Sequence, residues 1–205
     1  IMPDVGVITN ISYAHIKNFQ NLKGIANAKS EIINNMPQHG SIILNADDNF
    51  FKFLKSKSKK KKLKIISFGI NNKSNVSLIN VKSRKFNSVI YIKNNEKKLK
   101  FIIKKNLENY IYNILSTLAV ISVYFDLEKL DKFFFNDYKF PEGRGDLNTI
   151  KLKEKKINLI DESYNSNPLS LQFALNKLSI LNTKSKRKLV LLGDMLELGK
   201  YSKKL

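Results

Sequence analysis

Two stretches decide the fold of this chain: Asp161-Glu162-Ser163-Tyr164-Asn165-Ser166-Asn167-Pro168 and Leu192-Gly193-Asp194-Met195-Leu196-Glu197-Leu198-Gly199. Each follows a short apolar run, over residues 157–160 and 189–192, that predicts a buried strand. Asn167 and Pro168 favour a helix start, because Asn caps the N-terminus and Pro presets φ at the first helical position. Ligands bind at the carboxyl edge of open α/β sheets, but two ordinary strand–helix turns would have the same spacing.

Outward from these stretches, apolar periodicity predicts an α/β chain. We expect parallel strands over residues 5–9, 41–44 and 64–68, and a helix over residues 22–36. A short helix should precede the lysine-rich segment. Three alternating stretches near residues 76–81, 88–92 and 99–103 predict an antiparallel meander. Helices over residues 107–125 and 127–135 and a linker at residues 141–145 follow; strands at 147–152, 157–160 and 189–192 with a helix at 168–181 then begin a second βαβ unit.

The composition of the 205 residues favours a globular protein, since 42% are hydrophobic. Without cysteine, the chain forms neither disulfides nor thiolate metal sites. No apolar run reaches the roughly 18 residues of a membrane span, and no signal-peptide pattern opens the chain. We expect a cytoplasmic monomer. Because the chain does not begin with Met, opens almost directly into a predicted strand and stops shortly after another, we also expect an internal fragment of a longer protein.

The formal net charge is +20, and lysines gather in Lys55-Ser56-Lys57-Ser58-Lys59-Lys60-Lys61-Lys62. One interpretation is a basic polyanion-binding module without catalysis. The run lacks the arginines and aromatic residues that base readout and stacking favour. We therefore expect a solvated surface loop, weak non-specific polyanion binding at most, no specific nucleic-acid partner and no membrane insertion.

Lys29 falls within an apolar stripe of the predicted helix at residues 22–36. An ammonium is costly to bury there unless it is paired or neutralised. The alternative is a lysine whose stem covers apolar surface while its amine reaches water. His15 follows the first predicted strand in a loop, where it suits a ligand, capping or surface role. His39, in another loop, is expected at the surface.

Several motifs occur together in one order. They are Thr9-Asn10-Ile11-Ser12-Tyr13-Ala14-His15, the string at residues 24–32, Asn45-Ala46-Asp47-Asp48, Gly143-Arg144-Gly145 and the two stretches quoted first. This set resembles the Mur ligase family over nearly the whole chain. The resemblance implies part of a central ATP-binding domain over residues 1–141, built from a parallel sheet with helices and a small antiparallel meander. It also implies the start of a Rossmann-like C-terminal domain over residues 142–205.

The resemblance implies an activity as well. The strings look most like those of members that use ATP and Mg²⁺ to add D-alanyl-D-alanine to UDP-N-acetylmuramoyl-tripeptide in peptidoglycan precursor synthesis. Another Mur ligase specificity, or a folylpolyglutamate-synthase-like activity, is the alternative. The sequence has no Gly-x-x-x-x-Gly-Lys-[Ser/Thr] phosphate loop. In this family that loop lies upstream, so we expect the 205 residues alone to be inactive.

By the same resemblance, Lys29 would be carbamylated by carbon dioxide and would hold Mg²⁺ together with His15. Burial would suit this role of Lys29, because the neutral amine is the form that reacts with carbon dioxide. A further carboxylate ligand of the family would lie upstream.

The resemblance implies nucleotide contacts too. Arg144 would contact the phosphates, and its guanidinium and flanking glycines suit that role. Asp161 or Glu162 would contact the ribose, with Glu162 standing where the family usually has a second aspartate. Asn113 would lie near the adenine, although Asn109-Tyr110 replace the usual His-Asn pair. The same edge would be lined by Tyr164, Asn165 and Asn167.

Overall fold

The structure is a computed structural model and describes residues 2–14, 16–71, 73–181 and 187–202. The chain forms two compact units. Unit 1 comprises Ile1–Ile11 and Leu22–Asp137, and unit 2 comprises Ser12–Asn21 and Tyr138–Leu205. Within the described ranges, no helix has the length and apolar character needed to cross a bilayer.

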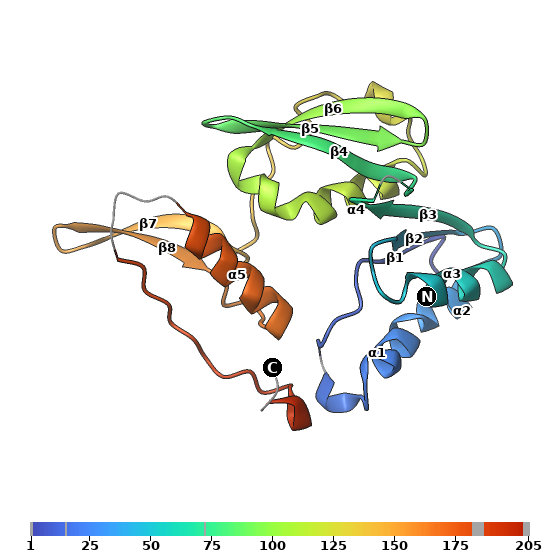
Figure 1. Cartoon of the computed structure of the whole chain (residues 1–205), viewed down its shortest axis with the longest axis horizontal. Coiled ribbons are helices and arrows are strands. Elements are labelled where there is room, and N and C mark those ends of the chain that lie inside the picture. Colours follow the sequence, from blue (N-terminus) through green and yellow to red (C-terminus); the bar gives the residue numbers. More distant parts are fainter. Residues whose placement is uncertain (1, 15, 72, 182–186, 203–205) are drawn as a thin grey trace. The chain divides into compact units, whose positions relative to one another are not determined.

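Unit 1 is built on a six-stranded sheet in the order β1-β2-β3-β4-β5-β6 (Figure 1). β1 (Val5–Ile8), β2 (Ser41–Asn45), β3 (Lys64–Gly69) and β4 (Val76–Ser83) pair in parallel. β5 (Asn87–Asn94) and β6 (Lys97–Lys104) continue the sheet from β4 in antiparallel pairing. Ile8 stands opposite Leu44, and Leu44 opposite Ser67, so the first three strands end level with one another. The predicted parallel sheet with an antiparallel meander is confirmed.

The core of unit 1 explains the apolar run Ile42-Ile43-Leu44 in the middle of β2. Ile42 and Leu44 pack on one face in a cluster with Ile33 and Leu54. These two belong to α2 (Glu31–Asn35) and α3 (Phe51–Lys60). Ile43, pointing to the opposite face, is also fully buried. α4 (Ile111–Ile121) packs against β1 to β4. A strand that is buried on both faces has no polar alternation.

The helix predicted over residues 22–36 is two helices. α1 (Leu22–Lys29) ends before Ser30, and α2 begins after it. The Ser30 hydroxyl donates to the Asn27 carbonyl (2.6 Å) and accepts a bond from Lys57 Nζ (2.8 Å). A serine that binds the preceding turn competes with the helical ladder, and Ser30 is fully buried where it does so. The apolar stripe around Lys29 is therefore interrupted one residue after it.

Two later helices are also shorter than predicted. Residues 107–125 form the 3₁₀ segment η2 (Lys105–Tyr110) and then α4. Only η3 (Leu127–Lys129) forms within residues 127–135. Asp126 accepts a bond from the Glu128 N–H (3.1 Å) and Asp131 from the Phe133 N–H (2.6 Å), so local side-chain turns replace the helical ladder.

The expectation that the lysine run forms a surface loop is wrong. Most of the run lies in α3. Straight-chain lysines are good helix formers, and the helix buries Leu54 and Ser58 four residues apart. The expectation that the lysines are solvated holds for Lys55, Lys59 and Lys60, which are exposed.

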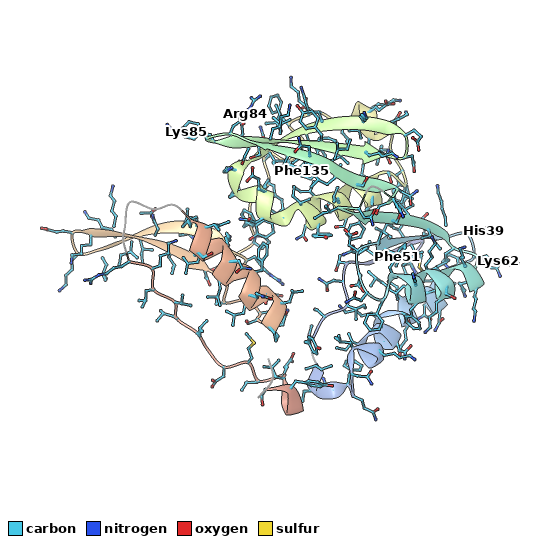
Figure 2. All side chains as sticks on the ribbon, viewed as in Figure 1. His39, Phe51, Lys62, Arg84, Lys85 and Phe135 are labelled. Carbon is cyan, nitrogen blue, oxygen red and sulfur yellow. The ribbon has the colours of Figure 1, made fainter. Side chains whose placement is uncertain are left out.

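His39 lies at the surface, as predicted. Both His39 and Lys62 have positive φ, 67° and 59°, and the His39 N–H donates to the Lys62 carbonyl (3.1 Å). Figure 2 labels the two residues at neighbouring turns. These turns precede β2 and β3, so His39 lies at the end of the sheet opposite the carboxyl edge.

Unit 2 contains a two-stranded antiparallel sheet of β7 (Asp146–Leu152) and β8 (Lys155–Asp161), followed by α5 (Pro168–Ile180). The predicted strand over residues 189–192 is wrong. That segment has no regular secondary structure, and Leu189 and Leu191 are 82% and 87% exposed. A strand needs a hydrogen-bonding neighbour, and β7 and β8 pair with each other alone in the described structure. η1 (Ile16–Asn18) and η4 (Gly199–Tyr201) pack together in this unit.

Candidate functional site

The carboxyl edge of β1, β2 and β3 in unit 1 is the first candidate site. Asn45, the last residue of β2, donates from Nδ2 to the Thr9 carbonyl beyond β1 (3.0 Å). Its Oδ1 accepts from the Asp47 N–H (3.0 Å). One side chain therefore joins the ends of two strands and shapes the turn that carries two aspartates.

Asp47 links three parts of this edge. Its Oδ2 accepts from the Ile70 N–H beyond β3 (2.6 Å) and from the Tyr112 hydroxyl on α4 (3.1 Å). A Cβ on Gly69 would lie 2.6 Å from the same oxygen, so the absence of a side chain there lets the carboxylate approach. Burial raises the pKa of Tyr112, and the charge and hydrogen bond of Asp47 raise it further.

Asp48 joins the loop after β1 to the turn after β2. Its Oδ2 accepts from the Ile11 N–H (2.7 Å) and its Oδ1 from the Phe50 N–H (2.8 Å). Both carboxylate oxygens therefore hold backbone donors, which fixes the path of the segment leading away from Asn10.

Lys29, at the end of α1, reaches the same edge. Its Nζ donates to the Asn10 carbonyl (2.9 Å). The Lys29 side chain is exposed, and the predicted apolar stripe is interrupted directly after it, where α1 ends. Partial desolvation nevertheless lowers the pKa of the amine, and the nearby Asp48 carboxylate opposes that shift. A lowered pKa enlarges the fraction of neutral, nucleophilic amine at a given pH.

Of the two residues predicted to bind a metal, His15 lies outside the described residues. Within the described residues, no three His, Cys, Asp or Glu side chains form a metal-binding group. The Lys29 amine has a lowered pKa and donates to a main-chain carbonyl, and its carbamylation stays a prediction. Asn113, predicted near an adenine, is exposed on α4 directly after Tyr112.

The second candidate site, in unit 2, centres on Arg144. Gly143 and Gly145 have φ of 70° and 85°, a conformation that favours glycine on both sides of the arginine. The Gly145 N–H donates to the Asp161 carbonyl (2.6 Å), and the Tyr164 N–H donates to the Gly143 carbonyl (3.3 Å). The guanidinium carbon lies 4.1 Å from the centroid of the Tyr164 ring. The loop and the segment after β8 therefore hold the cation on an aromatic face.

Asp161, the last residue of β8, and Glu162, the residue after it, have different surroundings. The Asp161 Oδ1 accepts from the Ser163 N–H (2.9 Å), and bonds from Ser163 lower the Asp161 pKa. Burial raises the pKa of Glu162, and the nearby Lys177 ammonium opposes the shift. The Glu162 Oε1 lies 3.8 Å from Lys177 Nζ, outside hydrogen-bond distance, and has no hydrogen-bond partner in the described structure. Asp161 thus favours its charged form, whereas Glu162 is held toward a cation inside the unit.

The remaining predicted residues, Tyr164, Asn165 and Asn167, differ in exposure and in their contacts. Tyr164 is 68% exposed. Asn167 caps α5, accepting from the Ser170 N–H (3.0 Å), while Ser170 Oγ accepts from the Asn167 N–H (2.9 Å), so the predicted helix start is confirmed. Asn165 and Asn167 line a cavity of about 20 Å³ together with Tyr13 and Met195. A cavity this small holds about one water molecule.

Three functional candidates escaped the sequence reasoning. Asp47 belongs to a quoted motif but was assigned no role, although two aspartates close to a strand end are a signal for the carboxyl edge. Tyr112 carried no signal, because an exposed tyrosine on an amphipathic helix is ordinary. Lys177, which is only 8% exposed, interrupts the apolar positions of α5 in the way that drew attention to Lys29.

Comparison with known proteins gives a consistent picture. The Mur ligase middle domain profile matches residues 1–121. UDP-N-acetylmuramoyl-tripeptide--D-alanyl-D-alanine ligase from Buchnera aphidicola subsp. Baizongia pistaciae is 33% identical over 208 residues, covering 97% of this chain and 41% of that protein. The chain therefore spans about two fifths of the length of this relative.

Solved structures agree with the fold. MurF from Acinetobacter baumannii matches with a TM-score of 0.81 at 25% identity, covering 98% of this chain and 42% of that one. MurF from Thermotoga maritima in complex with ADP matches with a TM-score of 0.77 at 21% identity, covering 98% and 44%. At 21% identity the second match shows likeness of fold alone.

Proposed function

Because the chain belongs to the Mur ligase family, we propose that it serves an ATP-dependent ligase that adds D-alanyl-D-alanine to UDP-N-acetylmuramoyl-tripeptide. ATP would phosphorylate the terminal carboxylate of the tripeptide, and the amine of D-alanyl-D-alanine would attack the acyl phosphate. Phosphate would leave as the amide forms. The 33% identity to the Buchnera ligase over 97% of the chain supports this specificity over that of another amide ligase.

The observation that carries the proposal is the position of Lys29. Its amine lies at the carboxyl end of β1, 2.9 Å from the Asn10 carbonyl, and partial desolvation lowers its pKa. The neutral amine reacts with carbon dioxide to give a carbamate, which has the charge and oxygen ligands that Mg²⁺ prefers. In this proposal Lys29 and His15 hold Mg²⁺, which when bound would neutralise phosphate charge during transfer.

The residues of unit 2 would serve the nucleotide. Arg144 would bind phosphate oxygens, since a guanidinium presents paired donors. We assign the ribose contact to Asp161 rather than Glu162, because Asp161 favours its charged form and Glu162 faces Lys177. Tyr164 and Asn165 would border the nucleotide, and Asn113 would approach the adenine. Residues 141–145 would act as a hinge, because their glycines tolerate large dihedral changes.

A chimera tests the function directly. This chain would replace the matching two fifths of the Buchnera ligase, and phosphate release would be measured with ATP, Mg²⁺, UDP-N-acetylmuramoyl-tripeptide and D-alanyl-D-alanine. We expect turnover that requires both substrates. The 205-residue chain alone should be inactive, because its sequence lacks the phosphate loop.

Variants of the chimera test the site. Lys29→Gln should abolish turnover, whereas Lys23→Gln, an exposed lysine of the same helix, should not. A folded chimera that turns over without D-alanyl-D-alanine but with another amine would overturn the specificity. Full activity in Lys29→Gln would overturn the role of the lysine.

A further inference from the structure

Lys177 is the only buried residue of α5, with 8% of its surface exposed. The large apolar residues Leu169, Phe173 and Leu175 of the same helix are more exposed, at 51%, 38% and 39%. An ammonium is costly to remove from water unless it is paired or hydrogen-bonded. The helix therefore buries a cation more deeply than its large apolar side chains at positions 169, 173 and 175, which points to a specific role for that cation.

The contacts of Lys177 identify the role. Its Nζ donates to the Gly145 carbonyl (2.9 Å), lies 3.8 Å from Glu162 Oε1 and lies 5.8 Å from the centroid of the Phe140 ring. Gly145 directly follows Arg144 in the chain. The lysine therefore connects α5 to the loop at residues 143–145, the arginine loop, and to Glu162 after β8.

The arginine loop has reason to need this contact. Glycines flank Arg144 on both sides, each at positive φ, and glycine restricts the backbone least of all residues. Two backbone bonds already tie the loop to the β8 side, from Gly145 to Asp161 and from Tyr164 to Gly143. The bond from Lys177 is charge-assisted and anchors the loop from a third element, the helix.

We propose that Lys177 is a positioning residue that anchors the Gly145 carbonyl and thereby holds the Arg144 guanidinium over the Tyr164 ring, in place to receive an anionic oxygen of a ligand. The role of Arg144 as a phosphate contact rests on the proposed function; the positioning by Lys177 does not.

Side-chain NMR of the 205-residue chain tests the positioning. The sequence has three arginines, Arg84, Arg144 and Arg187, so the Nε–Hε spectrum is simple to assign. The ring of Tyr164 should shift the Arg144 signal, and Tyr164→Leu gives the unstacked position. In Lys177→Met the Arg144 signal should move toward the position found in Tyr164→Leu, with Arg84 unmoved. Lys177→Arg should restore part of the shift, because it keeps a charged donor.

The matched control is Lys156→Met, an exposed lysine on β8, which should leave the Arg144 signal in place. An unmoved Arg144 signal in folded Lys177→Met overturns the proposal. If that variant does not fold, the wild-type ammonium spectrum decides. A Lys177 Nζ–H₃ signal protected from water exchange supports the anchor, and a freely exchanging one overturns it.

Binding of inorganic tripolyphosphate separates this inference from the proposed function. If Arg144 binds phosphate, Lys177→Met should weaken binding, because Arg144 is no longer held in place once the bond to the Gly145 carbonyl is lost. We expect a loss of roughly three- to tenfold, comparable to the contribution of one hydrogen bond. An Arg144 signal that moves while tripolyphosphate affinity stays constant supports the positioning and overturns the phosphate role of Arg144.

Discussion

The carboxyl edge of unit 1 and the arginine loop of unit 2 are both candidate sites, but they are built differently. At the edge of unit 1, Asn45, Asp47 and Asp48 bind backbone groups beyond neighbouring strands whose core residues are fully buried. In unit 2, the loop depends on a two-stranded sheet, one buried lysine and an exposed tyrosine. Parallel strands that end side by side can hold polar side chains in place through many backbone contacts. A unit with little buried apolar surface depends instead on a few polar contacts.

Truncation of a side chain should give the largest difference in stability between the two units. Leu44→Ala removes a fully buried side chain of β2 and should lower the free energy of unfolding by about 2–5 kcal/mol. Leu152→Ala, at a position 62% exposed on β7, should change it by less than about 0.5 kcal/mol. Urea denaturation measures both. Equal losses would contradict the difference in packing.

Loss of the arginine should have the next largest effect, on catalysis. In the active chimera, Arg144→Ala should raise the KM for ATP and lower kcat, by about 1.5–3 kcal/mol in kcat/KM, the range for a hydrogen bond to a charged group. Arg144→Lys should recover part, because an ammonium lacks the paired donors of a guanidinium. Unchanged constants in Arg144→Ala would make Arg144 a linker residue only.

Deletion of a carboxylate should affect the edge of unit 1 more than the segment after β8. Asp47→Ala removes the hydrogen bonds to the Ile70 N–H and the Tyr112 hydroxyl and should cost about 0.5–1.5 kcal/mol of stability for each. Tyr112→Phe removes one hydrogen bond and should cost about 0.5–1.5 kcal/mol. Asp161→Ala should cost less than Asp47→Ala, because Asp161 Oδ1 bonds to an N–H only two residues away, whereas Asp47 connects the end of β3 to α4. Thermal unfolding of the three variants checks this order.

The pH dependence of stability tests the interaction between Asp47 and the Tyr112 hydroxyl. The folded pKa of Tyr112 is raised, so its stabilising contribution is complete below the unfolded pKa and is lost as pH rises through the folded pKa. Wild-type stability should therefore fall at alkaline pH, and Tyr112→Phe should remove part of that fall. Asp47→Asn should bring the Tyr112 pKa back toward its ordinary value. Identical alkaline slopes in wild type and Tyr112→Phe would refute the coupling.

The smallest effect concerns the exposed lysines of α3. Replacing Lys52, Lys55 and Lys59 by alanine should change stability by less than about 0.5 kcal/mol per site. Binding of random-sequence DNA should be weak and should fall steeply with salt. The matched triple change at Lys98, Lys100 and Lys104 of β6 should weaken it to the same extent, since net charge alone drives it. A loss confined to the α3 variant, or a sequence preference, would favour a dedicated polyanion site.

Local sequence patterns were sufficient to predict the strands of unit 1, its meander and the start of α5. Apolar periodicity and the Asn-Pro cap act locally, so they can be read without the tertiary fold. Motif order was likewise sufficient to indicate the family. The positions of the predicted site residues relative to a nucleotide stay predictions.

The tertiary structure alone decided the features that depend on distant partners. The helix that apolar periodicity extends to Met36 is interrupted at Ser30, whose hydroxyl binds the Asn27 carbonyl, and Lys29 is exposed at the end of α1. Residues 189–192 lack a strand because periodicity cannot supply a hydrogen-bonding neighbour. Asp47 and Tyr112 are 65 residues apart, and Lys177 and Gly145 are 32 apart. Contacts over such separations arise only when packing brings the elements together, which no local pattern encodes.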